Sequence, residues 1–348
     1  MLGNSIADVV HKIQDAGDAL KLKNKFCWER TGERNMTQKE QNEQNEQNER
    51  NENMQRKQTE QTVRAAQKEQ TGLVLEGGGM RGIYTAGVLD VFMDNGISFD
   101  GVIGVSAGAI HGCSFVSGQK GRSIRYYKKY GCDSRFMGWK NLILTGDIVN
   151  EKFCYHEIPE ILDPYDYDAF NRSKTAFYAT CSNVETGEAE YLQITDMKAQ
   201  VDLMRASASL PYVSHIVEMD GMKLLDGGCT DSIPVEAFRK MGYTKTVVVL
   251  TRNRGYVKKP ENEKLASIYY RHYPKFVEAL KHRHIRYNQT IQKIEELERE
   301  GKIFVIRPSH ELTIGRTEHN PVKLQETYET GRRDALCRMK DLKEWWKA

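Results

Sequence analysis

One serine of this chain has the sequence setting of a catalytic nucleophile. Ser106 lies in Gly104-Val105-Ser106-Ala107-Gly108, after an apolar run that predicts a strand and at the start of a predicted helix. The small neighbours Gly104 and Gly108 allow the strained turn of a nucleophile elbow, which exposes the serine hydroxyl. The pattern therefore makes Ser106 a candidate nucleophile.

A glycine-rich loop precedes this serine. Gly77-Gly78-Gly79-Met80-Arg81-Gly82 follows a predicted strand, Leu73–Glu76, and opens a predicted helix. Glycines at such a place let backbone N–H groups face an anion, aided by the positive end of the helix. The same loop satisfies G-x-G-x-x-G, and Asp100 lies at about the distance of a ribose-binding acid, ~20 residues on. Taken alone, the loop is also compatible with a dinucleotide site.

A carboxylate follows a third predicted strand. Asp226-Gly227-Gly228 comes directly after Met222–Leu225, and in isolation it is an ordinary Asp-Gly turn. Asp231 is a rival carboxylate, which we expect instead to cap the short helix that starts after Pro234.

Together these motifs resemble the patatin-like phospholipase family, in its bacterial form. The flanking phrases Leu75–Gly82, Ile103–Ala109 and Arg205–Pro211 are similar to that family as well, and the resemblance covers about residues 72–250. It implies an α/β fold with a mostly parallel central sheet flanked by helices. It also implies a Ser–Asp dyad that hydrolyses carboxylic esters of lipids, phospholipid or lysophospholipid, through an acyl-serine intermediate with no cofactor and no metal.

Carried over to this chain, the resemblance assigns a role to each motif. The catalytic pair is Ser106 and Asp226, and the remaining positions form the oxyanion hole (Gly77, Gly78, Gly79, Arg81 and Gly82), the nucleophile elbow (Gly104 and Gly108) and the acid motif (Gly227 and Gly228). A serine needs a proton acceptor and its tetrahedral intermediate needs N–H donors. A dinucleotide-binding oxidoreductase leaves Ser106 and Asp226 unexplained and is the least favoured alternative. An acyltransferase with the same dyad and a non-catalytic lipid-binding or scaffold protein are the others.

The sequence contains no motif for a catalytic histidine or for a metal site. None of the nine histidines lies in a recognisable catalytic pattern, and His111 is rotated away from Ser106 on the same predicted helix, so we expect it to pack. No histidines and cysteines have the spacing of metal ligands. We predict that the dyad works without a histidine.

Composition limits the class of protein. The 348 residues carry 51 basic and 48 acidic side chains, which excludes a strongly basic nucleic-acid binder. No apolar run reaches the roughly 18–20 residues of a membrane span, and the N-terminus lacks the apolar core of about 7–15 residues that is expected of a secretory signal. The seven cysteines form no Cys-x-x-Cys pair, which suits a reducing cytoplasm. We expect a cytoplasmic protein.

The chain divides into four predicted regions. Residues 1–36 have the apolar spacing of an amphipathic helix, and the Gln/Asn/Glu-rich linker 37–71 has almost nothing to bury. Residues 72–250 alternate strand and helix, which is typical of a parallel sheet covered by helices. We expect residues 251–348 to form a C-terminal α/β extension packed on the catalytic domain, with a charged helix at about 286–300, a strand at 302–306 and a closing helix from Pro321 to Trp346.

Two basic stretches contain aromatic residues, at 120–140 and 252–286. A lipid acyl ester is the expected substrate, and these stretches suit peripheral contact with an anionic membrane surface. A solvated charged surface is the simpler interpretation of each stretch alone. Trp345 and Trp346 are either interfacial anchors or residues that close the last helix onto the core.

Overall fold

The computed structural model describes residues 69–347. The amphipathic helix expected at 1–36 and nearly all of the linker expected at 37–71 lie outside the described residues. Within them, no helix is long and apolar enough to cross a membrane.

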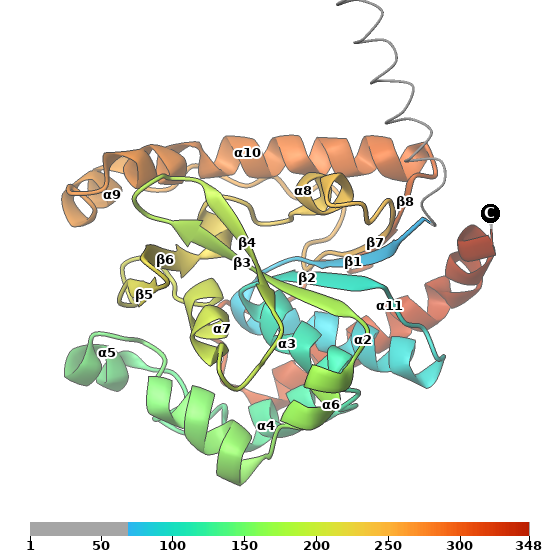
Figure 1. Cartoon of the computed structure of the whole chain (residues 1–348), viewed down its shortest axis with the longest axis horizontal. Helices are drawn as coiled ribbons and strands as arrows, with labels where there is room; N and C mark the ends of the chain where they lie inside the picture. Colours follow the sequence, from blue (N-terminus) through green and yellow to red (C-terminus); the bar gives the residue numbers. More distant parts are fainter. Residues whose placement is uncertain (1–68, 348) are drawn as a thin grey trace, which may run out of the picture. The chain divides into compact units, whose positions relative to one another are not determined.

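An eight-stranded sheet forms the centre of the described chain (Figure 1). Its order is β5-β6-β3-β2-β1-β7-β8, and β4 pairs with β3. Strands β3, β2, β1, β7 and β8 run parallel to one another, whereas β4 and β6 are antiparallel to β3. The predicted mostly parallel sheet is therefore confirmed. The strands are β1 (Thr71–Leu75), β2 (Gly101–Val105), β3 (Ala176–Asn183), β4 (Ala189–Ile194), β5 (Val217–Met219), β6 (Met222–Asp226), β7 (Lys245–Val249) and β8 (Ile303–Ile306).

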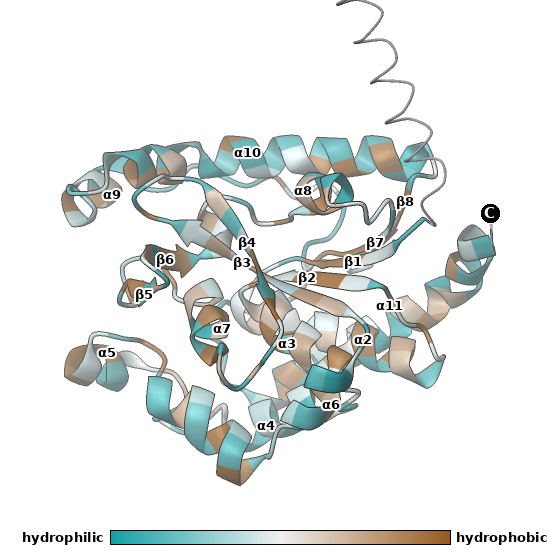
Figure 2. Cartoon of the chain, in the orientation of Figure 1, coloured by the Kyte–Doolittle hydropathy of each residue, from teal (hydrophilic) through white to brown (hydrophobic). Residues whose placement is uncertain are grey.

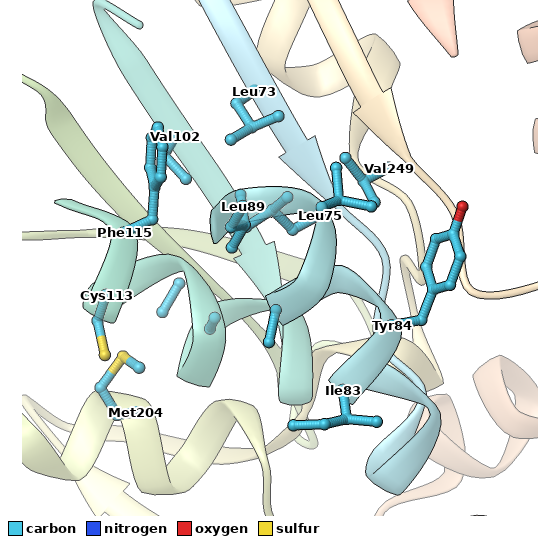
Figure 3. Close-up of a cluster of buried hydrophobic side chains, with 14 of the residues drawn as sticks. Leu73, Leu75, Ile83, Tyr84, Leu89, Val102, Cys113, Phe115, Met204 and Val249 are labelled. Carbon is cyan, nitrogen blue, oxygen red and sulfur yellow. The ribbon is translucent and has the colours of Figure 1, made fainter. Parts of the chain in front are cut away.

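Helices cover both faces of this sheet, as Figure 1 shows. On one face lie α2 (Ile83–Asp94), α3 (Ala107–Val116) and α11 (Pro321–Lys347), and on the other α8 (Val235–Lys240) and α10 (Pro274–Arg299). Because the central strands are covered twice, they are continuous apolar runs, and Leu73, Val74 and Leu75 are all fully buried. Figure 3 shows part of the core between β1, β2 and helix α2.

The C-terminal helix contacts the helix that follows the glycine loop. A Cβ at Gly87 of α2 would come 2.1 Å from the Tyr328 carbonyl oxygen of α11, and one at Gly331 would come 2.0 Å from the Tyr84 carbonyl oxygen. The two backbones therefore touch at glycines. At the end of α11, the Trp345 indole donates to the Gly301 carbonyl at 2.7 Å, and Trp346 packs 5.2 Å from Phe99. The tryptophans close the last helix onto the core and are not free interfacial anchors.

The remaining helices lie mostly in the long connection between β2 and β3. They are α4 (Arg122–Tyr130), α5 (Trp139–Thr145), the π-helix η2 (Lys152–Leu162) and α6 (Tyr167–Arg172), followed later by α7 (Val201–Ser207) and α9 (Glu263–Tyr269). Two short 3₁₀ turns, η1 (Gly79–Gly82) and η3 (Gly227–Cys229), follow β1 and β6.

Two predicted boundaries are wrong. The charged helix expected at about 286 starts at Pro274, because Pro occupies its first turn and Phe276 and Leu280 are buried among its basic residues. The sequence also predicts a hairpin of Val213–Glu218 and Met222–Leu225 around Asp220-Gly221, but its first strand is shorter: only Val217–Met219 pairs, and Tyr212 has a positive φ of 71° that bends the chain before it.

Candidate active site

Strands β2 and β6 meet end to end along one edge of β3. At positions 177–182, β3 pairs with β4 on its other edge. Val105, the last residue of β2, lies opposite Thr180, and Asp226, the last residue of β6, lies opposite Cys181. The register therefore brings Ser106 and Asp226 together, although 120 positions separate them in the chain.

Ser106 occupies a strained turn between β2 and α3. Its φ of 53° and ψ of −122° are unusual for a residue with a side chain. The turn is close to its surroundings: a Cβ at Gly108 would come 2.4 Å from the Leu75 carbonyl oxygen, and one at Gly104 would come 2.4 Å from the Ala109 nitrogen. Both positions therefore need glycine, which is the geometry of a nucleophile elbow.

Asp226 is buried, and one of its carboxylate oxygens has no hydrogen-bond partner among the described residues. Its Oδ1 accepts the Gly228 N–H at 2.8 Å, while Oδ2 has no hydrogen-bond partner of good geometry. Burial raises the pKa of Asp226, against the nearby Ser106 hydroxyl and the charge of Arg283, which lower it. A raised pKa makes this carboxylate a better proton acceptor than an exposed aspartate.

The glycine loop adds backbone donors beside the serine. Within the described residues, the N–H groups of Gly77, Gly78 and Gly79 find no acceptor. Gly79 has a φ of +57°, and a Cβ there would come 2.7 Å from the Arg316 carbonyl oxygen. That carbonyl accepts the Met80 N–H at 3.1 Å and holds the loop from outside.

The other two predicted oxyanion residues are placed differently. The Arg81 N–H donates to the Gly78 carbonyl at 3.3 Å, so only its side chain faces the site. Gly82 lines neither cavity beside Ser106; a Cβ there would come 2.6 Å from Cβ of Ala107. It serves the close packing of the loop on α3. In the acid motif, a Cβ at Gly227 would come 2.2 Å from the Thr180 carbonyl oxygen, so that position also permits close approach to β3.

Two serines of the phrase 205–211 tie the site together. Ser207 Oγ accepts the Ser106 N–H at 3.0 Å and donates to the Thr180 carbonyl at 2.7 Å. The Ser209 carbonyl accepts the Asp226 N–H at 2.8 Å. The family resemblance includes this phrase but assigns no role to its serines. Their positioning role depends on pairing between distant segments, which a linear pattern does not show.

Ser106 lies between two unlike cavities. The larger, about 150 Å³, is lined mainly by apolar side chains of α3, α4, η2 and α7. The smaller, about 40 Å³, is polar and extends from the glycine loop to α10. We call them the apolar cavity and the basic pocket. Four residues line both: Gly79, Ser106, Leu210 and Arg316.

The two basic stretches supply these walls. Tyr126, Tyr127 and Arg122 of α4 are buried and line the apolar cavity, and Arg122 lies 3.4 Å from Asp163. From the second stretch, Arg252, Lys258 and Arg283 line the basic pocket. These six side chains therefore line cavities, whereas Lys128, Lys129 and Lys264 of the same two stretches are exposed, as in the solvated charged surface that the sequence also allows. Nothing in the linear pattern distinguished an inward from an outward face.

The rival residues lie away from Ser106. Asp231 accepts the Tyr191 hydroxyl at 2.9 Å and the Ile233 N–H at 3.1 Å, and the expected cap of α8 is wrong. Asp100 precedes β2 and accepts the Thr71 N–H at 2.8 Å. It therefore lies at the amino-terminal ends of β1 and β2, whereas the glycine loop lies at the carboxyl-terminal end of β1. A ribose-binding acid would have to follow the strand.

Histidines stay away from the serine as well. No histidine lines either cavity in the described part of the chain. His111 is buried behind the loop, 3.0 Å from Ser123 Oγ, and burial lowers its pKa to about 3. Residues 69–347 contain no group of three or more His, Cys, Asp and Glu side chains placed to hold a metal ion.

Two parts of the chain match models of known families. Residues 73–239 match the family model of patatin-like phospholipase, and residues 273–347 match a domain of unknown function (DUF6363). "Uncharacterized protein YjjU" of Escherichia coli is 28% identical over 285 residues, 79% of this chain and 78% of that protein. Lysophospholipase NTE1 of Saccharomyces cerevisiae is 29% identical over 185 residues, which are 51% of this chain and 10% of that protein.

A solved structure, VipD from Legionella pneumophila, aligns with a TM-score of 0.39 and 13% identity, covering 79% of this chain and 67% of that chain. The family match spans the glycine loop, the serine turn and the Asp226 motif in one continuous stretch. Through residues 73–239, the chain belongs to the patatin-like phospholipase family.

Proposed function

We propose that this protein is a serine acyl hydrolase that cleaves carboxylic esters of lipids, phospholipid or lysophospholipid, through an acyl-Ser106 intermediate. The observation that carries the proposal is the meeting of β2 and β6 on β3, which sets a strained serine beside a buried carboxylate with a raised pKa. The apolar cavity next to Ser106 suits an acyl chain.

In the first half of the reaction, Ser106 Oγ attacks the ester carbonyl carbon while Asp226 takes its proton. The carbonyl oxygen becomes an oxyanion, and the unused N–H groups of Gly78 and Gly79, which line the same pocket as Ser106, are its donors. The bond to the leaving oxygen then breaks, and Asp226 returns the proton to the departing alcohol.

In the second half, water attacks the acyl-serine carbonyl carbon while Asp226 takes its proton. The bond between Ser106 Oγ and the acyl carbon then breaks, Asp226 returns the proton to Oγ, and the fatty acid leaves. Asp226 must be ionised at both steps. Because burial raises its pKa, we expect turnover to fall on acidification at a pH above the usual range of an aspartate.

Labelling with a fluorophosphonate probe tests the nucleophile. The probe should modify Ser106 in the parent and leave Ser106→Ala unlabelled, and only the parent should release fatty acid from lysophospholipids. Labelling with acyl transfer to an added alcohol in place of water would identify an acyltransferase. Lipid binding with neither labelling nor turnover would identify a non-catalytic lipid-binding protein.

We also infer that α5 contacts a membrane. Trp139, Ile143 and Leu144 are each more than 70% exposed on this short helix, and apolar segments of α5 are visible in Figure 2. The adjoining η2 contributes Tyr155 and Ile158 to the apolar cavity, so a bilayer at α5 would lie next to the route of an acyl chain.

Vesicle sedimentation tests this contact. Replacing the three exposed α5 residues together by serine should lower binding to vesicles at least about tenfold, since the full burial of even one such side chain contributes about 1.5–3 kcal/mol. Leu336→Ser on α11, also exposed, is the control.

The six described free cysteines suit a cytoplasmic location, peripheral to the membrane.

A further inference from the structure

The basic pocket carries more positive charge than its surroundings neutralise. Its lining includes two carboxylates, Glu76 and Asp226, and five cations: Arg81, Arg252, Lys258, Arg283 and Arg316. Such a concentration of cations in a small space is unfavourable unless an anion shares it.

Four of these cations lack an ionic partner. In residues 69–347, no carboxylate forms an ion pair with Arg81, Arg252, Lys258 or Arg316, whereas Arg283 pairs with Glu261 at 3.0 Å. Arg81 is 7% exposed, and its Nε has no hydrogen-bond partner among the residues that the structure describes. Burial and the nearby Arg252 lower its pKa to about 10. A buried guanidinium with an unused donor, aimed into a pocket, indicates an anionic ligand.

The two carboxylates of the pocket have other roles: Glu76 is hydrogen-bonded and Asp226 is the proposed base. The Glu76 oxygens accept the Tyr287 hydroxyl and the Thr251 N–H, and Asp226 faces Ser106. No carboxylate therefore remains to bind a cationic headgroup.

The aromatic rings of the pocket are engaged too. The Arg252 guanidinium lies 4.2 Å from the centre of the Tyr256 ring, and the Lys258 ammonium lies 4.5 Å from that of Tyr287. A quaternary ammonium is recognised by free aromatic faces. Here the protein's own cations occupy those faces and would repel it.

The basic pocket and the apolar cavity meet at Ser106. An anion in the pocket would therefore be attached a few bonds from the ester that Ser106 attacks, with its acyl chain in the apolar cavity. We propose that the substrate is an ester lipid with a phosphate monoester headgroup, of the lysophosphatidate type; this inference rests on the proposed function. The small pocket of about 40 Å³ and its five cations suit a compact dianion.

Paired substrates test this assignment. We expect the parent to hydrolyse oleoyl lysophosphatidate with kcat/KM at least about tenfold above oleoyl lysophosphatidylcholine, since one charged hydrogen bond is worth about that factor or more. Arg252→Gln and Lys258→Gln should each reduce this preference by about tenfold, through KM. Arg254→Gln, two positions along and paired with Glu298 at the surface, is the matched control and should keep the preference.

Binding measurements separate this inference from the proposed function. Calorimetry on Ser106→Ala should show glycerol 3-phosphate binding that Arg252→Gln weakens in the same background. If the parent hydrolyses an uncharged short ester through Ser106 but prefers lysophosphatidylcholine, the headgroup assignment is overturned and the hydrolase stands. If glycerol 3-phosphate binds but no ester is cleaved, the proposed function fails and the anion site stands. Inorganic phosphate binding as tightly as glycerol 3-phosphate, without any substrate preference, would overturn the assignment in favour of a free-phosphate site.

Discussion

The two cavities beside Ser106 differ in chemistry and in the part of the chain that builds them. The apolar cavity is walled mainly by the connection between β2 and β3, with α7 beyond it. The basic pocket takes four of its five cations, all but Arg81, from residues after β7, beyond the matched patatin-like region. The Ser106 turn, which borders both cavities, therefore lies between walls that different parts of the chain build.

We expect the two cavities to have different effects on substrate binding: the apolar cavity contributes affinity for the acyl chain, and the basic pocket selects the headgroup. Apolar burial stabilises a bound chain by about 25 cal/mol per Å² without regard to direction. Charged donors discriminate between headgroups because an unpaired buried charge is costly. We therefore expect changes on the apolar side to alter chain-length preference, changes on the basic side to alter headgroup preference, and changes at the boundary to abolish turnover of every ester.

The largest expected effect is at the boundary. Asp226→Asn should lower kcat by about 10³-fold or more on charged and uncharged esters alike, nearly as much as Ser106→Ala, because the two residues act as one unit. Steady-state kinetics on an uncharged short-chain ester measures it. Asp231→Asn is the matched control: its carboxylate meets Tyr191 and Ile233, so stability can fall but turnover should remain. The reverse outcome would identify Asp231 as the base.

The parallel sheet, the strained turn at Ser106 and the position of Asp226 at the end of a strand could be predicted from the sequence, because each depends on a local pattern. Apolar runs predict buried strands, and Gly104 and Gly108 directly flank the serine they serve. The sequence did not reach Ser207, whose role depends on Thr180 and Ser106 in two other segments. The sequence also could not predict which basic residues face inward. Lys258 and Lys259 are adjacent lysines, yet only Lys258 lines the basic pocket.

A second prediction concerns the loop that lies on both cavities. Gly79→Ala should lower kcat by about 10²-fold with little change in KM, since it displaces donors that act on the oxyanion. Its Cβ would meet the Arg316 carbonyl. Gly96→Ala is the control for backbone strain: Gly96 has a similar φ of +65°, and a Cβ there meets nothing within 4 Å. If both variants lose the same activity, the loss is one of folding and the loop has no special role.

A third prediction narrows the apolar side. Ile110 lies one helical turn after Ser106 and lines the apolar cavity. Ile110→Trp should reduce kcat/KM about 10- to 100-fold for a sixteen-carbon acyl ester, and less for a four-carbon ester, because filling the cavity excludes the long chain. Ile268→Trp, on the exposed face of α9, should leave the ratio of the two unchanged. An equal loss on both esters would mean that the acyl chain lies elsewhere.

The smallest expected effect is a pH dependence of the basic side. Burial and the nearby charges of Arg283 and Arg316 lower the pKa of Lys258 to about 7, against Glu76 and Glu261, which raise it; the Tyr287 ring is its other neighbour. The ammonium is therefore charged below about pH 7 and neutral above it, and a bound phosphate shifts the balance toward the charged form. We expect KM for lysophosphatidate to rise about three- to tenfold between pH 6 and pH 9, while KM for an uncharged ester changes little. Lys258→Arg keeps its charge over this range, so its KM for lysophosphatidate should stay nearly flat. Identical profiles in the parent and Lys258→Arg would show that another group, such as the phosphate itself, titrates.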